Sequence, residues 1–419
     1  MTIQTLRRIR TTFLASLFVM AIGQSNAQTQ AYDQIDDQTA HDVLPRSLLT
    51  GEHFQVSPLV VSYGYQNRFV IHSDFGTFEA NGNAMVPIRI GEIWALAEIE
   101  KIKNTKAFGT ALKASAKAPF LAAKSLVTHP VDTVTGVPKG AFTLIRRLGN
   151  MVTDDRGELE DARAKEIIGI SDAKRKYAHQ LGVNVYSDNK KLQKELNRVA
   201  WASFAGGLPV AVGTMGAGVA ARTVITSLKA SKNLNDTMRD TTPEDLRKAN
   251  RKYLIDRGVA KDEVERFLSL DHFSPRHQTA IVQALSEMPD VANAELLIRQ
   301  SFLTEDIESA FFVQQTAELV SAYNQRIAKV SRFGTVNNIL VFQTETNKAV
   351  FTLPVDTFRW TERSSGNVRS ILTMLRSVPS VQGYEVWITG QATELARRNV
   401  EALGVTLVED ASTTLLSGG

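Results

Sequence analysis

Residues 199–221 read VAWASFAGGLPVAVGTMGAGVAA, a run of 23 residues that contains no charged side chain. Five glycines interrupt its alanines and valines. The length and the small residues are typical of a membrane span or a membrane hairpin. However, Pro209 beside two glycines, and the scarcity of large aliphatic residues, lower its hydropathy below that of an ordinary span. We therefore interpret it as a small-residue packing hinge that is buried against residues 108–123, with membrane insertion as the alternative.

The chain before this hinge is rich in β-forming residues. The segments 54–65, 67–73 and 76–82 carry β-branched and aromatic residues, and residues 73–76 have turn chemistry. They predict a β-hairpin with a third strand. Because three uncovered strands are barely stable, we expect a helix around residues 88–99 to cover one face.

The chain after the hinge reads first as helices. Threonine before proline at Thr242 and serine before proline at Ser274 predict two helix starts, each with an N-cap residue and proline at the first helical position. Gly258 and Pro289 predict breaks, and residues 304–306 open a last long helix whose apolar spacing continues to Val330. A helical bundle follows from these lengths.

After Gly334 the pattern changes to strands and helices with short links. We expect the order ββαβαβ, with the last βαβ pairing in parallel. The predicted elements are strands at 337–344, 348–355, 384–390 and 405–410, and helices at 368–378 and 393–403. The predicted fold class is α+β, mainly α-helical, with an N-terminal β-hairpin or small sheet and a C-terminal α/β unit.

The first 27 residues read as a secretory signal peptide. Three arginines precede an apolar core at 13–22, and Ser25-Asn26-Ala27 is a small-residue cleavage site. A transmembrane anchor is the competing interpretation, but a bilayer span needs about 20 apolar residues. We expect an exported protein, periplasmic or secreted. The predicted parts are the signal peptide at 1–27, a mobile N-terminal arm at 28–50, the hairpin with basic helices at 51–152, a helical domain at 153–333 and the α/β unit at 334–419.

The chain has no cysteine. An exported protein has access to disulfides, so its stability must come from packing instead. The absence also excludes a thiol nucleophile and a thiolate metal site. We expect no cofactor and no bound metal.

Charge is segregated along the chain. Residues 28–100 carry ten acidic and three basic side chains, whereas residues 101–152 carry nine basic and one acidic. The basic segment predicts amphipathic helices that suit an anionic membrane surface or an acidic protein partner. The alternative is that its lysines are solvated or neutralised by the acidic segment. After export the net charge is small, and nucleic acid is not an expected partner. The candidate binding surface consists of Lys106, Lys113, Lys117, Lys124, Arg146 and Arg147.

Few residues suggest catalysis. Asp271, His272 and His277 form the densest polar cluster and are weak candidates for a hydrolytic site. Five residues on a helix separate two imidazoles by roughly 140°, and no nucleophile elbow or HExxH motif is present, so capping and surface roles are favoured. The turn at 389–391 is interpreted as a tight link and not as an anion site. The aromatic segment 358–363 remains a candidate edge for an acidic ligand.

Four phrases carry a resemblance. Residues 129–140, 181–207, 245–259 and 273–285 read HPVDTVTGVPKG, LGVNVYSDNKKLQKELNRVAWASFAGG, DLRKANRKYLIDRGV and FSPRHQTAIVQAL. Together they resemble a group of exported bacterial proteins without an assigned activity. The resemblance implies export and a shared fold, and it brings no catalytic residue.

The sequence thus favours an exported, non-enzymatic interaction or envelope-associated protein. The alternative is a periplasmic hydrolase whose site lies between the helical and the α/β parts.

Overall fold

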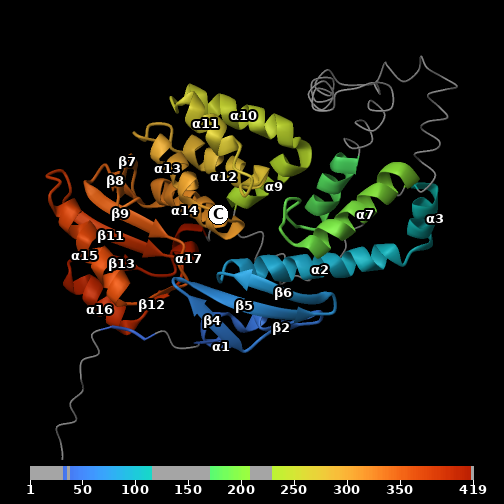
Figure 1. Cartoon of the computed structure of the whole chain (residues 1–419), viewed down its shortest axis with the longest axis horizontal. Helices are drawn as coiled ribbons and strands as arrows, with labels where there is room; N and C mark the ends of the chain where they lie inside the picture. The colour runs from blue at the N-terminus through green and yellow to red at the C-terminus, as the bar shows by residue number, and fades with distance from the viewer. Residues whose placement is uncertain (1–31, 35–37, 116–169, 208–228, 417–419) are drawn as a thin grey trace, which may run out of the picture.

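The fold is α+β and mainly helical, as the sequence predicts, with an antiparallel sheet near the N-terminus and a second sheet near the C-terminus (Figure 1). The structure is a computed structural model that describes residues 32–34, 38–115, 170–207 and 229–416.

The N-terminal sheet is built around the predicted hairpin. Strands β5 (Gln66–Ser73) and β6 (Gly76–Asn81) pair antiparallel, and the Ser73 hydroxyl closes their turn by donating to the Gly76 carbonyl at 2.8 Å. The predicted strand at 54–65 is divided into β3 (Phe54–Val56) and β4 (Leu59–Tyr63), which pair antiparallel with the second and the first half of β5, respectively. The hairpin prediction is confirmed.

The prediction of a mobile arm is wrong for residues 38–50. They form β1 (Gln38–Thr39), α1 (Ala40–Val43), the 3₁₀ turn η1 (Arg46–Leu48) and β2 (Thr50–Gly51), and β1 and β2 pair with β4 and β3. Ala40 and Leu44 are buried in the core of the sheet. Elements of two to four residues are too short to show a hydrophobic period, which is why the sequence pattern does not reveal them.

Helix α2 (Met85–Lys103) covers the sheet as expected. Ile90 and Ile93 are buried against the strands, and Trp94 meets His53 edge to face with ring centroids 4.9 Å apart. The second half of α2 packs against α3 (Lys106–Ser115), α7 (Lys190–Gly206) and the helical residues 170–180. Helix α2 therefore joins the sheet to the first helical group.

The described part of the hinge behaves as the packing interpretation requires. Val199 and Ala202 on α7 are buried in one cluster with Phe108 and Ala111 of α3. Helix α7 ends at Gly206, and Gly207 caps it in the left-handed conformation at φ 68°, which glycine adopts without strain. Residues 208–221 and 116–123 lie outside the described residues. Among the helices that are described, none combines the length and apolarity needed to cross a bilayer.

The bundle that follows contains α9 (Lys229–Asp240), α10 (Pro243–Asp256), α11 (Lys261–Leu268), α12 (Pro275–Ser286), α13 (Glu295–Gln300), η2 (Ser301–Leu303) and α14 (Ile307–Arg326). The predicted caps are confirmed: the side chains of Thr242 and Ser274 accept from the backbone N–H groups of Asp245 and His277. The last helix, however, ends at Arg326, and Val330 begins a strand. The prediction that the helix continues to Val330 is therefore wrong.

The C-terminal unit has a five-stranded sheet in the order β13-β11-β9-β8-β7. Strands β7 (Val330–Val336), β8 (Ile339–Thr344) and β9 (Lys348–Leu353) are antiparallel, whereas β9, β11 (Gly383–Ile388) and β13 (Thr406–Val408) are parallel, as predicted for the last βαβ. Helices α15 (Glu362–Arg376) and α16 (Glu394–Ala402) follow the predicted order. Strand β7, the short parallel pair β10 (Thr357–Phe358) and β12 (Gln391–Ala392), and α17 (Ala411–Leu416) were not expected.

Helix α14 lies between the bundle and the C-terminal sheet. Its Tyr323 packs edge to face on Phe342 and Trp387 of the sheet, with centroids 5.0 and 5.4 Å away. The opposite face of the sheet is covered by α15, whose Ile371 and Leu375 are buried against it. The helical and α/β parts thus share one hydrophobic core.

The N-terminal part is fastened to the C-terminal unit by polar contacts. The backbone N–H of Asp33 donates to the Trp360 carbonyl, and the Asp33 carboxylate accepts from the Trp360 N–H and the Thr393 hydroxyl. The ring of Tyr65 stacks on Phe358 with centroids 6.3 Å apart. The first and last parts of the chain therefore lie side by side (Figure 1).

Candidate functional site

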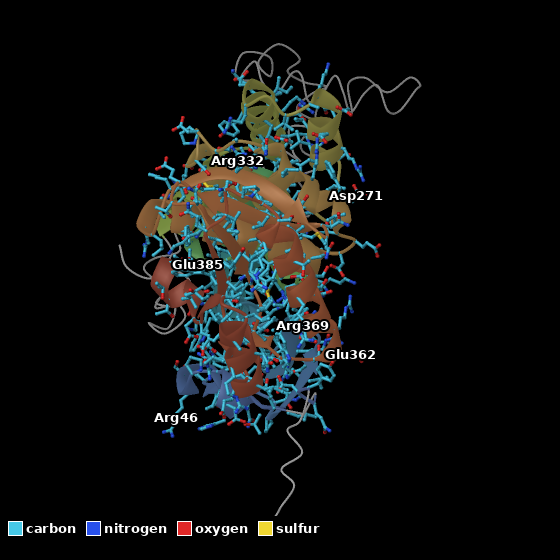
Figure 2. All side chains as sticks on the ribbon, turned by 90° about the vertical axis from the view of Figure 1, so that its left-hand side faces the viewer. Arg46, Asp271, Arg332, Glu362, Arg369 and Glu385 are labelled. Atoms are coloured by element: carbon cyan, nitrogen blue, oxygen red, sulfur yellow. The ribbon has the colours of Figure 1, made fainter. Side chains whose placement is uncertain are left out.

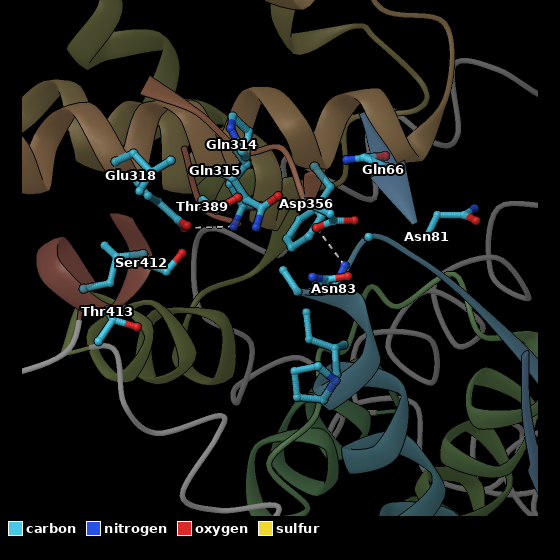
Figure 3. Close-up of a pocket in the computed structure, with 18 of the residues that line it drawn as sticks. Gln66, Asn81, Asn83, Gln314, Gln315, Glu318, Asp356, Thr389, Ser412 and Thr413 are labelled. Atoms are coloured by element: carbon cyan, nitrogen blue, oxygen red, sulfur yellow. Dashed lines mark hydrogen bonds between the residues drawn. The ribbon is translucent and has the colours of Figure 1, made fainter. Parts of the chain in front are cut away.

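A polar cavity of about 400 Å³ lies where the three parts meet, and we call it the inter-unit cavity (Figure 3). The end of β6 and the start of α2 form one wall, α14 forms the second, and α17 with the loops after β9 and β11 forms the third. Cavities of this size and place are typical of small-molecule sites.

Eleven of the nineteen residues that line the cavity have hydrogen-bonding side chains. Besides apolar groups such as Pro87, Phe311 and Leu319, the cavity is lined by five carboxamides, three hydroxyls and three ionisable groups. These polar residues are Gln66, Asn81, Asn83, Gln314, Gln315, Thr389, Ser412, Thr413, Arg276, Glu318 and Asp356.

Asp356, between β9 and β10, fastens the N-terminal sheet to the C-terminal unit. Its two carboxylate oxygens accept from the backbone N–H groups of Asn67 at 2.8 Å and Asn83 at 3.0 Å, and its own N–H donates to the Tyr65 carbonyl at 2.9 Å. The carboxylate is thus held by backbone donors from β5 and from the loop before α2. On the side of the C-terminal unit, Gly390 packs against the backbone of Asp356: a Cβ atom there would lie 1.9 Å from the Asp356 carbonyl oxygen.

Burial raises the pKa of Asp356 to about 6 from an ordinary value of 3.8, and the two backbone hydrogen bonds oppose this rise. Since the pKa is higher in the folded state, the folded protein binds the proton more tightly between about pH 4 and pH 6. Lowering the pH through this window therefore adds stability through this group, and that stability is lost as the pH rises.

We expect this linkage to appear when the wild type is compared with Asp356→Asn. The free energy of unfolding of the wild type, relative to the variant, rises by on the order of 2 to 3 kcal/mol between pH 7 and pH 4. Urea denaturation at several pH values measures the difference, in which groups common to both proteins cancel. A difference that stays constant with pH would contradict the assignment.

Glu318 and Arg276 bring opposite charges to the same cavity. Glu318 on α14 accepts a hydrogen bond from the Gln314 amide at 2.9 Å, and Arg276 on α12 donates to Asn235 at 2.6 Å. Within the described parts of the chain neither forms an ion pair. Burial raises the pKa of Glu318 and lowers the pKa of Arg276, so each charge is only weakly compensated by its surroundings.

Gln314 leaves an acceptor without a donor. The residue is 5% exposed, and its amide nitrogen donates to Glu318 (Figure 3). Its side-chain oxygen has no hydrogen-bond partner among the described residues. A buried polar atom of this kind costs about 1 to 3 kcal/mol unless something donates to it. The oxygen itself is buried in the protein, so the part of Gln314 that bears on the inter-unit cavity is its hydrogen bond to Glu318.

The three predicted catalytic residues lie in different surroundings, although His272 and His277 are close enough to interact electrostatically. Asp271 is exposed at the edge of the helical part (Figure 2), and His272 hydrogen-bonds Thr304 at 2.8 Å. His277 lies in the first turn of α12, where burial lowers its pKa to about 4 and keeps the imidazole neutral. Phe273 contacts both imidazole rings. The described residues contain no group of three metal-ligating side chains, and the three candidates do not line the cavity.

Only part of the predicted basic surface is described. Lys106 and Lys113 are exposed on α3, while the apolar side chains Phe108 and Ala111 of the same helix are buried against α7. Because Phe108 and Ala111 are used for packing, this helix presents to a membrane or an acidic partner its lysines and the exposed Leu112. The other predicted basic residues, Lys117, Lys124, Arg146 and Arg147, lie outside the described residues.

The candidate aromatic edge is an internal interface. Phe358, Arg359 and Trp360 are all buried, and Arg359 donates to Ser62 of the N-terminal sheet at 3.1 Å. The prediction that this segment offers an exposed edge to an acidic ligand is therefore wrong. The physical reason is that the N-terminal part covers it.

Comparisons with protein-family models, curated proteins and solved structures gave no match to this chain.

Proposed function

We propose that the protein is an exported, non-enzymatic binding protein that holds a small polar molecule in the inter-unit cavity. The observation that carries this proposal is the inter-unit cavity itself, whose lining contains five carboxamides and three hydroxyls together with Arg276 and Glu318. The carboxamides and hydroxyls around it supply donors and acceptors of the kind that orient a polar ligand. Export rests on the signal at residues 1–27, and envelope association through the basic segment remains a prediction.

A hydrolase is the second candidate, because two carboxyl groups with raised pKa values, Glu318 and Asp356, line the cavity. Perturbed carboxyl groups are common in active sites. Both oxygens of Asp356, however, already accept backbone hydrogen bonds. Only Glu318 is left to act on a ligand, and this favours binding over acid–base catalysis by a carboxyl pair.

The test compares two phenylalanine substitutions on α17. Ser412 lines the cavity, whereas Thr414 on the same helix is exposed and does not. We expect Ser412→Phe to fill the cavity and abolish ligand binding, and Thr414→Phe to leave it unchanged. Calorimetric titration of the mature protein with glycylglycine, sucrose and inorganic phosphate measures saturable binding at one site.

Binding of at least one of these probes to the wild type and to Thr414→Phe, but not to Ser412→Phe, supports the proposal. Absence of binding to the wild type, or binding that survives Ser412→Phe, overturns it. Circular dichroism establishes that both variants remain folded.

A further inference from the structure

The charged groups of the inter-unit cavity are arranged as complements to a ligand that bears both signs of charge. Arg276 comes from α12 and Glu318 from α14, so two packed helices of the bundle supply one cation and one anion to the same wall. The two side chains interact electrostatically without forming an ion pair. A direct pair would have satisfied both charges and left nothing for a ligand.

The unused hydrogen-bonding capacity points the same way. The guanidinium of Arg276 has five N–H donors, of which one makes the contact to Asn235, and its planar fork suits a carboxylate. Glu318 has one oxygen engaged by Gln314, and its other oxygen accepts from none of the described residues. That second oxygen is left as an acceptor for an ammonium group.

On these grounds, and resting on the proposed function, we infer that the inter-unit cavity binds a zwitterion of the amino-acid or short-peptide class. Arg276 receives the carboxylate, and Glu318 receives the ammonium group. Charge-assisted hydrogen bonds of this kind are roughly twice as strong as neutral ones. The carboxamides Gln315, Asn81 and Asn83 are available to the peptide group.

The experiment uses the mature protein and three probes that differ only at their ends: glycylglycine, N-acetylglycylglycine and glycylglycinamide. We expect the affinity for glycylglycine to exceed that for either blocked probe by about tenfold or more, because each blocked probe loses one charge-assisted contact. Sucrose is the uncharged comparison.

Two variants assign the ends. We expect Arg276→Gln to weaken glycylglycine about tenfold or more and to leave the amide probe unchanged, because that probe has no carboxylate. We expect Glu318→Gln to weaken glycylglycine similarly and to leave the acetylated probe unchanged. Glu345→Gln, at an exposed glutamate that does not line the cavity, is the matched control and changes nothing.

The inference is supported if Arg276→Gln binds glycylglycine no more tightly than the amide probe, and Glu318→Gln binds it no more tightly than the acetylated probe. A merely structural effect would weaken the binding of every probe. Equal affinity for all three dipeptide probes, or binding of sucrose alone, overturns the inference that the ligand is a zwitterion. The proposed binding function stands in either case. Absence of binding by every probe, including phosphate, contradicts the proposed function and the inference together.

Discussion

Asp356→Ala is expected to lower the free energy of unfolding by about 2 to 4 kcal/mol at neutral pH. The substitution removes the acceptor of two backbone N–H groups, those of Asn67 and Asn83, at an interface where Asp356 is 8% exposed. Each buried donor left without a partner costs about 1 to 3 kcal/mol, and relief from burying a carboxylate offsets part of that cost. Asp356→Asn keeps one acceptor oxygen and is expected to fall in between.

The loss of stability is expected at the contact between the N-terminal sheet and the C-terminal unit. Because Asp356 joins the N-terminal sheet to the C-terminal unit, its removal is expected to split thermal unfolding into two transitions, the first from the N-terminal part. Scanning calorimetry measures this, and urea denaturation gives the free energy. Asp290→Ala, at an exposed aspartate, is the control and changes stability by no more than about 0.5 kcal/mol. A single transition with wild-type stability would mean that Asp356 does not fasten the two parts.

Gly390→Ala adds only one methyl group, yet it is expected to lower the free energy of unfolding strongly. The new Cβ would lie 1.9 Å from the Asp356 carbonyl oxygen and 2.5 Å from the carbonyl carbon, and both are backbone atoms that no side-chain rotation moves. The β10 and β12 strands must then separate, since the pair begins at Thr357 and Gln391, the residues next in sequence. We expect a loss of about 3 kcal/mol or more, at the upper end of the cost of overpacking.

Gly366→Ala provides the matched control on α15. This glycine is exposed within the helix, and its added Cβ meets no atom within 4 Å. Alanine favours a helix interior over glycine by about 1 kcal/mol, so the control is expected to gain stability. Urea denaturation of both variants measures the contrast. If Gly390→Ala unfolds like the wild type, the close approach of the two loops is not needed for the fold.

The elements that the sequence predicts correctly are those whose signals are local. Thr242 and Ser274 cap helices because an N-cap needs only the residues of the following turn. The hairpin closed at Ser73 and Gly76 is likewise specified by adjacent residues. The sequence does not predict strand β7, because the apolar spacing of α14 continues to Val330 and no glycine or proline separates the helix from the strand.

The inter-unit cavity could not be predicted in the same way. Asn67 and Asp356 are 289 positions apart, and no pattern in either neighbourhood indicates that a carboxylate will meet backbone donors. Arg276 lies in the same capped turn as His277, and no pattern in the sequence around it indicates that its side chain lines a cavity.

The contacts of Asp33 with the C-terminal unit affect the order in which parts of the chain fold during synthesis. Its partners Trp360 and Thr393 are synthesised last, with Thr393 separated from Asp33 by 360 positions. Contacts over such distances form late, because a long loop must close before they contribute. The surface of the N-terminal part that contacts the C-terminal unit therefore stays uncovered until nearly the whole polypeptide has been synthesised.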